Sequence, residues 1–135
     1  MSARAPLASG WVPALRSRAV TGGTEWIVDG YGCDPVRLAD RARVCALLGH
    51  IVAELDLRVV GEPLVHGFAA PGGVTAMVLL TESHLCCHTY PESGLATFNL
   101  YCCRERPPWP WADRLGDALG ARRVEVRRMQ RGGGS

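Results

Sequence analysis

The sequence has no lysine, and all fifteen of its basic residues are arginine. A chain without lysine cannot hold pyridoxal phosphate as a lysine Schiff base, and it cannot use the lysine of a phosphate-binding P-loop. It also has no C-x-x-C pair and no G-x-S-x-G motif. The strongest sequence signals for a zinc site and for an α/β-hydrolase nucleophile are therefore missing.

Long hydrophobic runs are absent too. No apolar run approaches the ~20 residues that span a bilayer, and residues 1–20 lack the continuous apolar core of a secretory signal. We therefore expect a cytoplasmic protein with no membrane partner. The formal net charge of +2 is too small to indicate a nucleic acid partner.

The 135 residues are 47% hydrophobic and 21% charged, which is typical of one globular domain with a modest core. Six residues are cysteine, and four of them form the adjacent pairs Cys86-Cys87 and Cys102-Cys103. Neighbouring cysteines rarely bond each other, because the geometry is strained. Without a secretory signal we expect reduced thiols.

The spacing of apolar residues and turn signals predicts an α+β fold. Asp34 and Pro35 should begin a helix as its N-cap and first residue, and Gly120 should end another. The predicted elements are strand 25–31, helix 35–55, strand 57–66 with a break at Gly61 and Pro63, strand 74–80, a hairpin around the turn at 91–94 with its second strand at 95–103, helix 111–119 and edge strand 122–129. This order predicts a two-layer sandwich, a mostly antiparallel sheet with helices on one face. A flexible extension at 1–22 and a flexible tail at 130–135 are expected around it.

Reactive side chains are concentrated in LTESHLCCHTYP, residues 80–91. On a strand, His84, Cys86 and His88 would share one face and could form a zinc site with Cys102 or Cys103. A hydrolase would need a serine, a histidine and an acid, which are all present. The third interpretation is a hairpin whose histidines and cysteines only pack in the core.

The hairpin geometry brings further reactive groups together. If residues 91–94 form a four-residue turn, the residue numbers of paired positions sum to about 185. Glu82 then lies opposite Cys103, and Ser83 lies opposite Cys102. A packed core hairpin does not require a serine beside a thiol, so the pairing favours a reaction centre.

At this point the residues resemble a known family. TESHLCCHTYPESG is similar to the self-cleavage segment of the prokaryotic S-adenosylmethionine decarboxylase proenzymes, whose usual form is ESHLxxHTWPExG. VDGYGCD (28–34) and HGFAAPGGVTA (66–76) are similar to two further segments, and Cys103 matches the catalytic cysteine. The resemblance covers about residues 23–129, which it implies are a pyruvoyl-dependent decarboxylase domain.

The resemblance implies that the chain cuts itself between Glu82 and Ser83 into β and α chains. Ser83 would become a pyruvoyl group, the only cofactor expected, with no metal. Thr75 and His88 match the residues that assist processing, and Cys103 matches the proton donor of the decarboxylation. The family also implies S-adenosylmethionine as substrate and a homodimer of αβ units.

Substrate contacts are implied more loosely. Glu92 matches an acid that binds ribose hydroxyls, Phe68 matches, after a one-residue gap, an aromatic that stacks on adenine, and Leu85 would line the same pocket. Three positions depart from the family pattern, namely Tyr90 for Trp, Asn99 for Asp and Arg104 for Gly. Because they lie near the pocket, two alternatives stay open: an ornithine or arginine decarboxylase on the same fold, and a non-catalytic homologue that binds a partner or metal. Cys102, where the family more often has Thr, has no assigned role.

Overall fold

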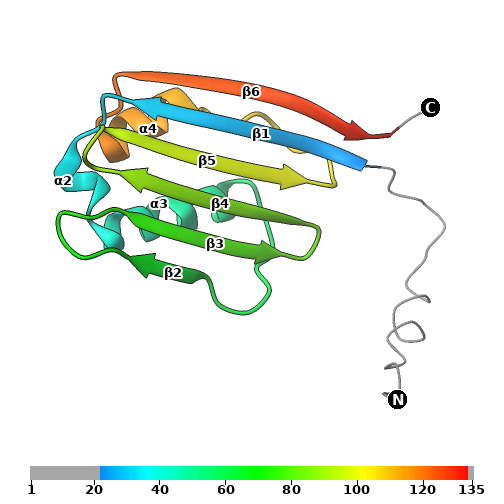
Figure 1. Ribbon diagram of the computed structural model, residues 1–135. Helices are drawn as coiled ribbons and strands as arrows, with labels where there is room; N and C mark the ends of the chain where they lie inside the picture. The colour runs from blue at the N-terminus through cyan, green and yellow to red at the C-terminus, as the bar shows by residue number, and fades with distance from the viewer. Residues whose placement is uncertain (1–21, 134–135) are drawn as a thin grey trace, which may run out of the picture.

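The computed structural model describes residues 22–133, which form six strands and three helices (Figure 1). The strands are β1 (Gly22–Tyr31), β2 (Leu64–Gly67), β3 (Val74–Leu80), β4 (Ser83–Tyr90), β5 (Leu95–Cys102) and β6 (Arg123–Gly132). The helices are α2 (Pro35–Leu38), α3 (Arg41–Glu54) and α4 (Trp111–Leu119). No helix within the described residues is long and apolar enough to cross a membrane.

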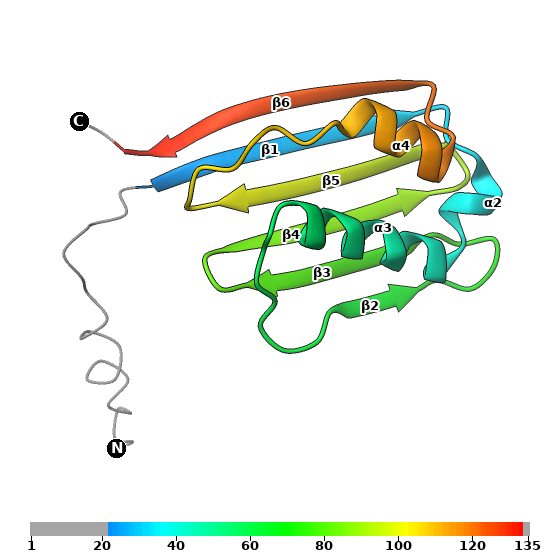
Figure 2. The ribbon, with the colours of Figure 1, turned by 180° about the vertical axis from the view of Figure 1, so that it is seen from behind.

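The six strands form one antiparallel sheet in the order β2-β3-β4-β5-β1-β6. Figure 2 shows α3 and α4 lying across one face of this sheet. Figure 1 views the opposite face, which no helix of the described part covers and which we call the open face. The predicted two-layer α+β sandwich is confirmed.

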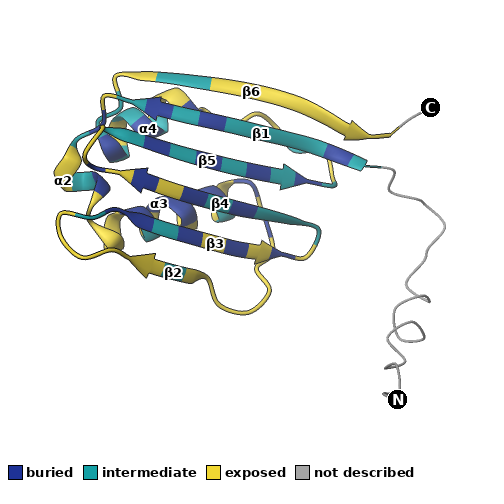
Figure 3. Ribbon diagram, viewed as in Figure 1, coloured by how far each residue is buried: buried dark blue, intermediate teal, exposed yellow. Residues whose placement is uncertain are grey.

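The core lies between the sheet and the helices, because apolar side chains alternate along the strands. In β3 the residues Val74, Ala76, Val78 and Leu80 are buried, while those between them are partly or fully exposed (Figure 3). The helices bury one side each against these residues. Their buried members are Val44, Leu47, Leu48 and Ile51 in α3, and Trp111, Leu115 and Leu119 in α4.

The predicted helix at 35–55 is two helices. Asp34 caps α2 by accepting a hydrogen bond from Val36 N at 2.9 Å, and Pro35 is its first residue, as predicted. The chain then leaves the helix, and Asp40 caps α3 by accepting from Arg43 N at 3.1 Å. Apolar spacing continues across the break, so only the second capping aspartate distinguishes two helices from one.

The prediction of a strand at 57–66 was wrong over most of its length. Only β2 from Leu64 is a strand, and Val59 makes a single bridge to Leu80. Gly61 has a positive φ of 73°, and Pro63 has no N–H for a ladder hydrogen bond. These two residues interrupt the pairing that the apolar residues on either side suggested.

The ends of the domain extend further than predicted. Gly22, assigned to the extension, begins β1, and residues 130–132, assigned to the tail, end β6. The two strands pair from Gly22 opposite Gly132 onwards, so sheet hydrogen bonds order a glycine-rich sequence that gives no strand signal. Residues 1–21 of the predicted extension and residues 134–135 of the predicted tail lie outside the described residues.

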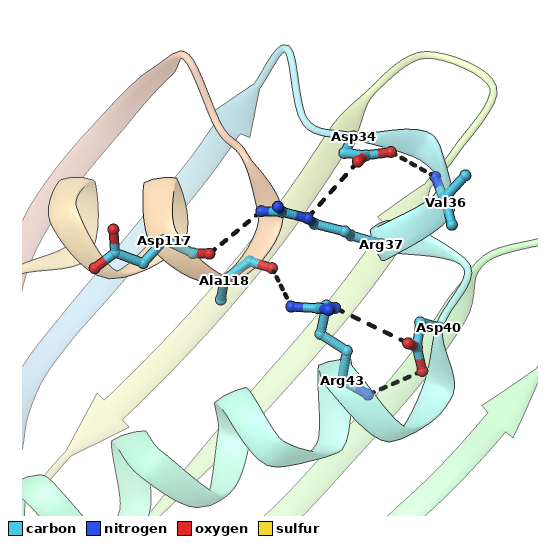
Figure 4. Close-up of polar contacts among 7 residues, drawn as sticks. All are labelled: Asp34, Val36, Arg37, Asp40, Arg43, Asp117 and Ala118. Carbon is cyan, nitrogen blue, oxygen red and sulfur yellow. Dashed lines mark hydrogen bonds and ion pairs between the residues drawn. The ribbon is translucent and has the colours of Figure 1, made fainter.

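Helix α4 occupies the predicted residues and ends at Gly120, whose φ is 74°. Two guanidinium groups hold its C-terminal end (Figure 4). Arg37 donates to the carbonyl of Asp117 at 3.3 Å, and Arg43 donates to that of Ala118 at 3.4 Å. Both cations lie where the helix dipole is negative, and they tie α2 and α3 to α4.

Thr89 is a buried polar side chain that ties the helix layer to the sheet. Its hydroxyl donates to the carbonyl of Leu38 at 2.7 Å and accepts from Val74 N at 2.8 Å. The substitution Thr89→Val keeps the shape but leaves both backbone groups without a partner, so we expect the free energy of unfolding to fall by about 1–3 kcal/mol. Urea denaturation of the Ser83→Ala chain measures this, with Thr97→Val on the open face as the control. A loss no larger than that of the control would contradict the assignment.

Candidate active site

The hairpin of β4 and β5 has the predicted register. Ser83 pairs with Cys102, His84 with Tyr101 and Cys86 with Asn99, so each pair sums to 185. Glu82, just before β4, accepts a hydrogen bond at its carbonyl oxygen from Cys103 N at 3.2 Å. The juxtaposition of the serine segment with the two cysteines, expected from turn length alone, is thus present.

Glu82 and Ser83 lie at the tight turn between β3 and β4. Leu80 pairs with Ser83, so Thr81 and Glu82 are the two residues of the turn. The Thr81 amide donates to the carbonyl of Arg58 at 2.9 Å. The peptide bond that follows Glu82 is therefore held by contacts from neighbouring segments on both sides of the turn.

The two adjacent thiols differ in their surroundings. Cys102, the cross-strand partner of Ser83, is buried on the helix side of the sheet. Cys103 follows the strand and is partly exposed. Burial raises the pKa of the Cys102 thiol, although the nearby Arg106 guanidinium and Ser83 hydroxyl act in the opposite direction. Cys102 therefore stays a neutral thiol near pH 7, and Cys103 is the accessible member of the pair.

Thr75 and His88 form a second polar centre. They are cross-strand partners on β3 and β4, and Thr75 Oγ1 lies 3.0 Å from His88 Nδ1. Both side chains are on the open face, where His88 is exposed. The structure brings together the two residues that the family resemblance assigned to processing.

These two centres lie at opposite ends of the sheet. Ser83 begins β4 and His88 lies five residues further along the same strand. At a rise of about 3.3 Å per residue, five residues span about 16 Å. His88 of one chain therefore cannot touch Ser83 of that chain, which also removes the serine–histidine hydrolase alternative for this pair.

A hydrogen-bonded chain crosses the open face near the start of β4, on the side of the sheet opposite to the Ser83 side chain. His84 Nε2 lies 3.1 Å from Asn99 Oδ1, Asn99 Nδ2 donates to Glu25 at 2.7 Å, and Arg131 Nη1 donates to Glu25 at 2.7 Å. Because Asn99 Oδ1 accepts, His84 carries a proton on Nε2. The hydrogen bonds from Asn99 and Arg131 lower the pKa of Glu25. Sequence reasoning missed this network, and its only signal was a polar residue at alternate positions of β1 and β5.

Of the three residues predicted to contact the substrate, Phe68 and Glu92 are exposed and Leu85 is buried. Phe68 is 57% exposed and lies edge-on to His66, with ring centroids 4.6 Å apart. Glu92 is exposed in the turn after β4, at the same end of the sheet as Phe68 and His88. The prediction for Leu85 is corrected, because its side chain is fully buried toward the helices. It lies on the same side of β4 as Ser83, but with no exposed area it offers no surface to a substrate.

The zinc alternative finds no support. His84, Cys86 and His88 do alternate with the buried residues of β4. Within residues 22–133, however, no group of three or more His, Cys, Asp or Glu side chains is arranged to hold a metal ion. Strand spacing separates the potential ligands along β4, so sharing a face does not bring them to one point.

Comparison with known proteins identifies the family of the chain. Residues 24–132 match the family described as S-adenosylmethionine decarboxylase. The S-adenosylmethionine decarboxylase proenzyme of Clostridium tetani is 31% identical over 111 residues, which cover 82% of this chain and 86% of that protein. The proenzyme of Caldicellulosiruptor saccharolyticus is 34% identical over 114 residues, which cover 82% of this chain and 88% of that protein.

A solved structure is also similar. The crystal structure of the adenosylmethionine decarboxylase from Aquifex aeolicus superposes with a TM-score of 0.71 at 29% identity, and the match covers 87% of this chain and 96% of that chain. The family match spans nearly all the described residues. The resemblance seen in the sequence is therefore confirmed, and the chain belongs to the S-adenosylmethionine decarboxylase family.

Proposed function

We propose that this chain is a self-processing, pyruvoyl-dependent carboxy-lyase that converts S-adenosylmethionine to decarboxylated S-adenosylmethionine and CO2 for spermidine biosynthesis. Its relatives are named proenzymes. The observation that carries the proposal is the 3.2 Å hydrogen bond from Cys103 N to the Glu82 carbonyl, at the peptide that the family motif marks for cleavage. A cytoplasmic location and the lack of a nucleic acid partner stay predictions.

Cleavage begins at the Ser83 hydroxyl oxygen, which attacks the carbonyl carbon of Glu82. Negative charge develops on the Glu82 oxygen, where the Cys103 N–H already donates. A donor in place before the reaction stabilises this charge without reorganisation. The amide bond then breaks, Ser83 N takes up a proton, and an ester joins the two residues.

His88 is the proposed base for the next step. The 3.0 Å contact with Thr75 orients its ring, and in the tautomer that donates from Nδ1 to that hydroxyl the Nε2 atom has a lone pair. Nε2 takes the α-proton of Ser83, and the Glu82 carboxylate leaves. The remaining dehydroalanine takes up water and releases ammonia, so the α fragment starts with a pyruvoyl group and the β fragment ends at Glu82.

The residues present fit this group, since Ser83 supplies its carbon atoms and no lysine is needed. The pyruvoyl group would bind the α-amine of the substrate covalently and accept the electrons released with CO2. Cys103 is the proposed donor that returns a proton to the substrate Cα. It is the accessible thiol of the adjacent pair, whereas Cys102 is buried.

We further propose that the active site is completed by a second copy of the chain. The cleavage turn and the Thr75–His88 pair lie at opposite ends of the sheet, about 16 Å apart on the rise of β4. In a two-fold interface, the cleavage turn of each copy can lie beside the Thr75–His88 pair of its partner. The open face also exposes large apolar side chains, including Leu64 at 70% and Leu79 at 56%, which such an interface would cover.

Substrate identity is tested by decarboxylation of carboxyl-labelled S-adenosylmethionine, ornithine and arginine. We expect CO2 from S-adenosylmethionine, because Glu92 and the exposed Phe68 suit a ribose and an adenine ring. Glu92→Gln should raise KM for this substrate by about tenfold, because it weakens one hydrogen bond to a charged group. The rate of self-cleavage should change little. Release of CO2 from ornithine or arginine alone would contradict the proposed substrate.

The two-copy site is tested by mixing two variants that are each impaired in self-cleavage. Ser83→Ala chains keep His88 and cannot cut themselves, while His88→Ala chains keep Ser83 and should cut slowly. After unfolding and refolding together, about half of the His88→Ala chains pair with a Ser83→Ala chain and should regain cleavage.

Gel electrophoresis of the mixture against each variant refolded alone measures the recovery. The matched control is a double variant, Ser83→Ala with His88→Ala, which should rescue nothing. Equal cleavage of His88→Ala chains with either partner would show that His88 does not act across the interface.

A further inference from the structure

Arg104 holds the side chain of the residue whose carbonyl is attacked. Its Nε donates to one carboxylate oxygen of Glu82, and its Nη2 donates to the other at 3.1 Å. This two-pronged geometry orients a carboxylate more strictly than a single contact does. The preceding residue, Cys103, donates its backbone N–H to the Glu82 carbonyl. Two consecutive residues therefore hold the main chain and the side chain of Glu82.

The backbone of the turn does not have the geometry that two-residue hairpins favour. Neither Thr81 nor Glu82 is among the described residues with positive φ, so the turn lacks the primed geometry that suits two-residue hairpins. Contacts from other segments help to hold the turn, among them the Thr81 amide on the Arg58 carbonyl and the two contacts to Glu82. A change in any of these should alter how the Glu82–Ser83 peptide is presented.

We propose that Arg104 is a positioning residue for self-cleavage: by gripping the Glu82 carboxylate it keeps the Glu82 carbonyl on the Cys103 N–H while Ser83 attacks. This proposal rests on the proposed function. Arg104 contacts none of the reacting atoms and makes or breaks no bond. After cleavage the same ion pair keeps Glu82, then the last residue of the β fragment, bound to Arg104 of the α fragment.

The expected effect is modest, because the Arg104 side chain is 65% exposed and Glu82 is 37% exposed. Exposed ion pairs are weakened by water and salt. We expect Arg104→Ala and Arg104→Gly to slow cleavage of freshly refolded chain by about two- to fivefold. The cleavage rate of Arg104→Lys should fall between these and the wild-type rate. Lysine keeps the positive charge but lacks the planar group that donates to both carboxylate oxygens.

A double-variant cycle shows whether Arg104 acts through Glu82. Glu82→Gln should slow cleavage by a similar factor, and Glu82→Gln with Arg104→Ala should be no slower than either alone. High salt should slow the wild type and leave Arg104→Ala unchanged. The control is Arg123→Ala, which breaks an equally exposed pair with Glu125 on β6. A wild-type rate in Arg104→Ala, or effects that add in the double variant, would overturn the proposal.

Amide hydrogen exchange tests the role of Arg104 independently of whether the chain cuts itself. In Ser83→Ala chains, which stay uncut, adding Arg104→Ala should speed exchange at the Cys103 amide and leave the buried strands unchanged. No difference at Cys103 would contradict the role of Arg104, whether or not the wild type cuts itself. A wild-type chain that never cuts, with faster exchange in the double variant, would instead contradict the proposed function alone.

Discussion

The antiparallel register of β4 against β5 is the constraint on which the site depends. It places Ser83 opposite Cys102 and brings the Cys103 amide onto the Glu82 carbonyl, 3.2 Å away. A slip of one residue would turn every side chain of the strand to the other face and would separate the amide from the carbonyl. The buried residues on the helix side, with the four-residue turn after β4, hold that register. Packing of the core therefore sets the chemistry of the turn.

The regular pairing of β4 also separates the two reactive centres of the site. A strand that pairs along its whole length is straight on the scale of five residues, so the distance between Ser83 and His88 is about 16 Å. The two centres cannot meet without breaking the sheet. The exposed apolar side chains of the open face and the separated reactive groups both support the proposal that a second copy supplies the missing half of the site. In that proposal the sheet serves as both scaffold and interface.

Local signals in the sequence predicted much of this structure. Asp34, Pro35 and Gly120 mark helix ends by capping chemistry, and the turn at 91–94 gave the hairpin register. Contacts between distant segments were not predictable in the same way. Glu25 and Arg131 are 106 residues apart in the chain, and only the position of β6 beside β1 joins them. Leu85 was placed in the substrate pocket because family position does not show how deeply a side chain is buried.

The account is tested most directly by an intact mass spectrum of the freshly purified chain under denaturing conditions. We predict two fragments, one ending at Glu82 and the other beginning at the former Ser83 with the mass of a pyruvoyl group. Ser83→Ala, measured alongside, should give one uncut chain. A wild-type protein that stays as a single chain after long incubation would contradict self-processing. Fragments divided at any other peptide bond would contradict the assignment of Ser83.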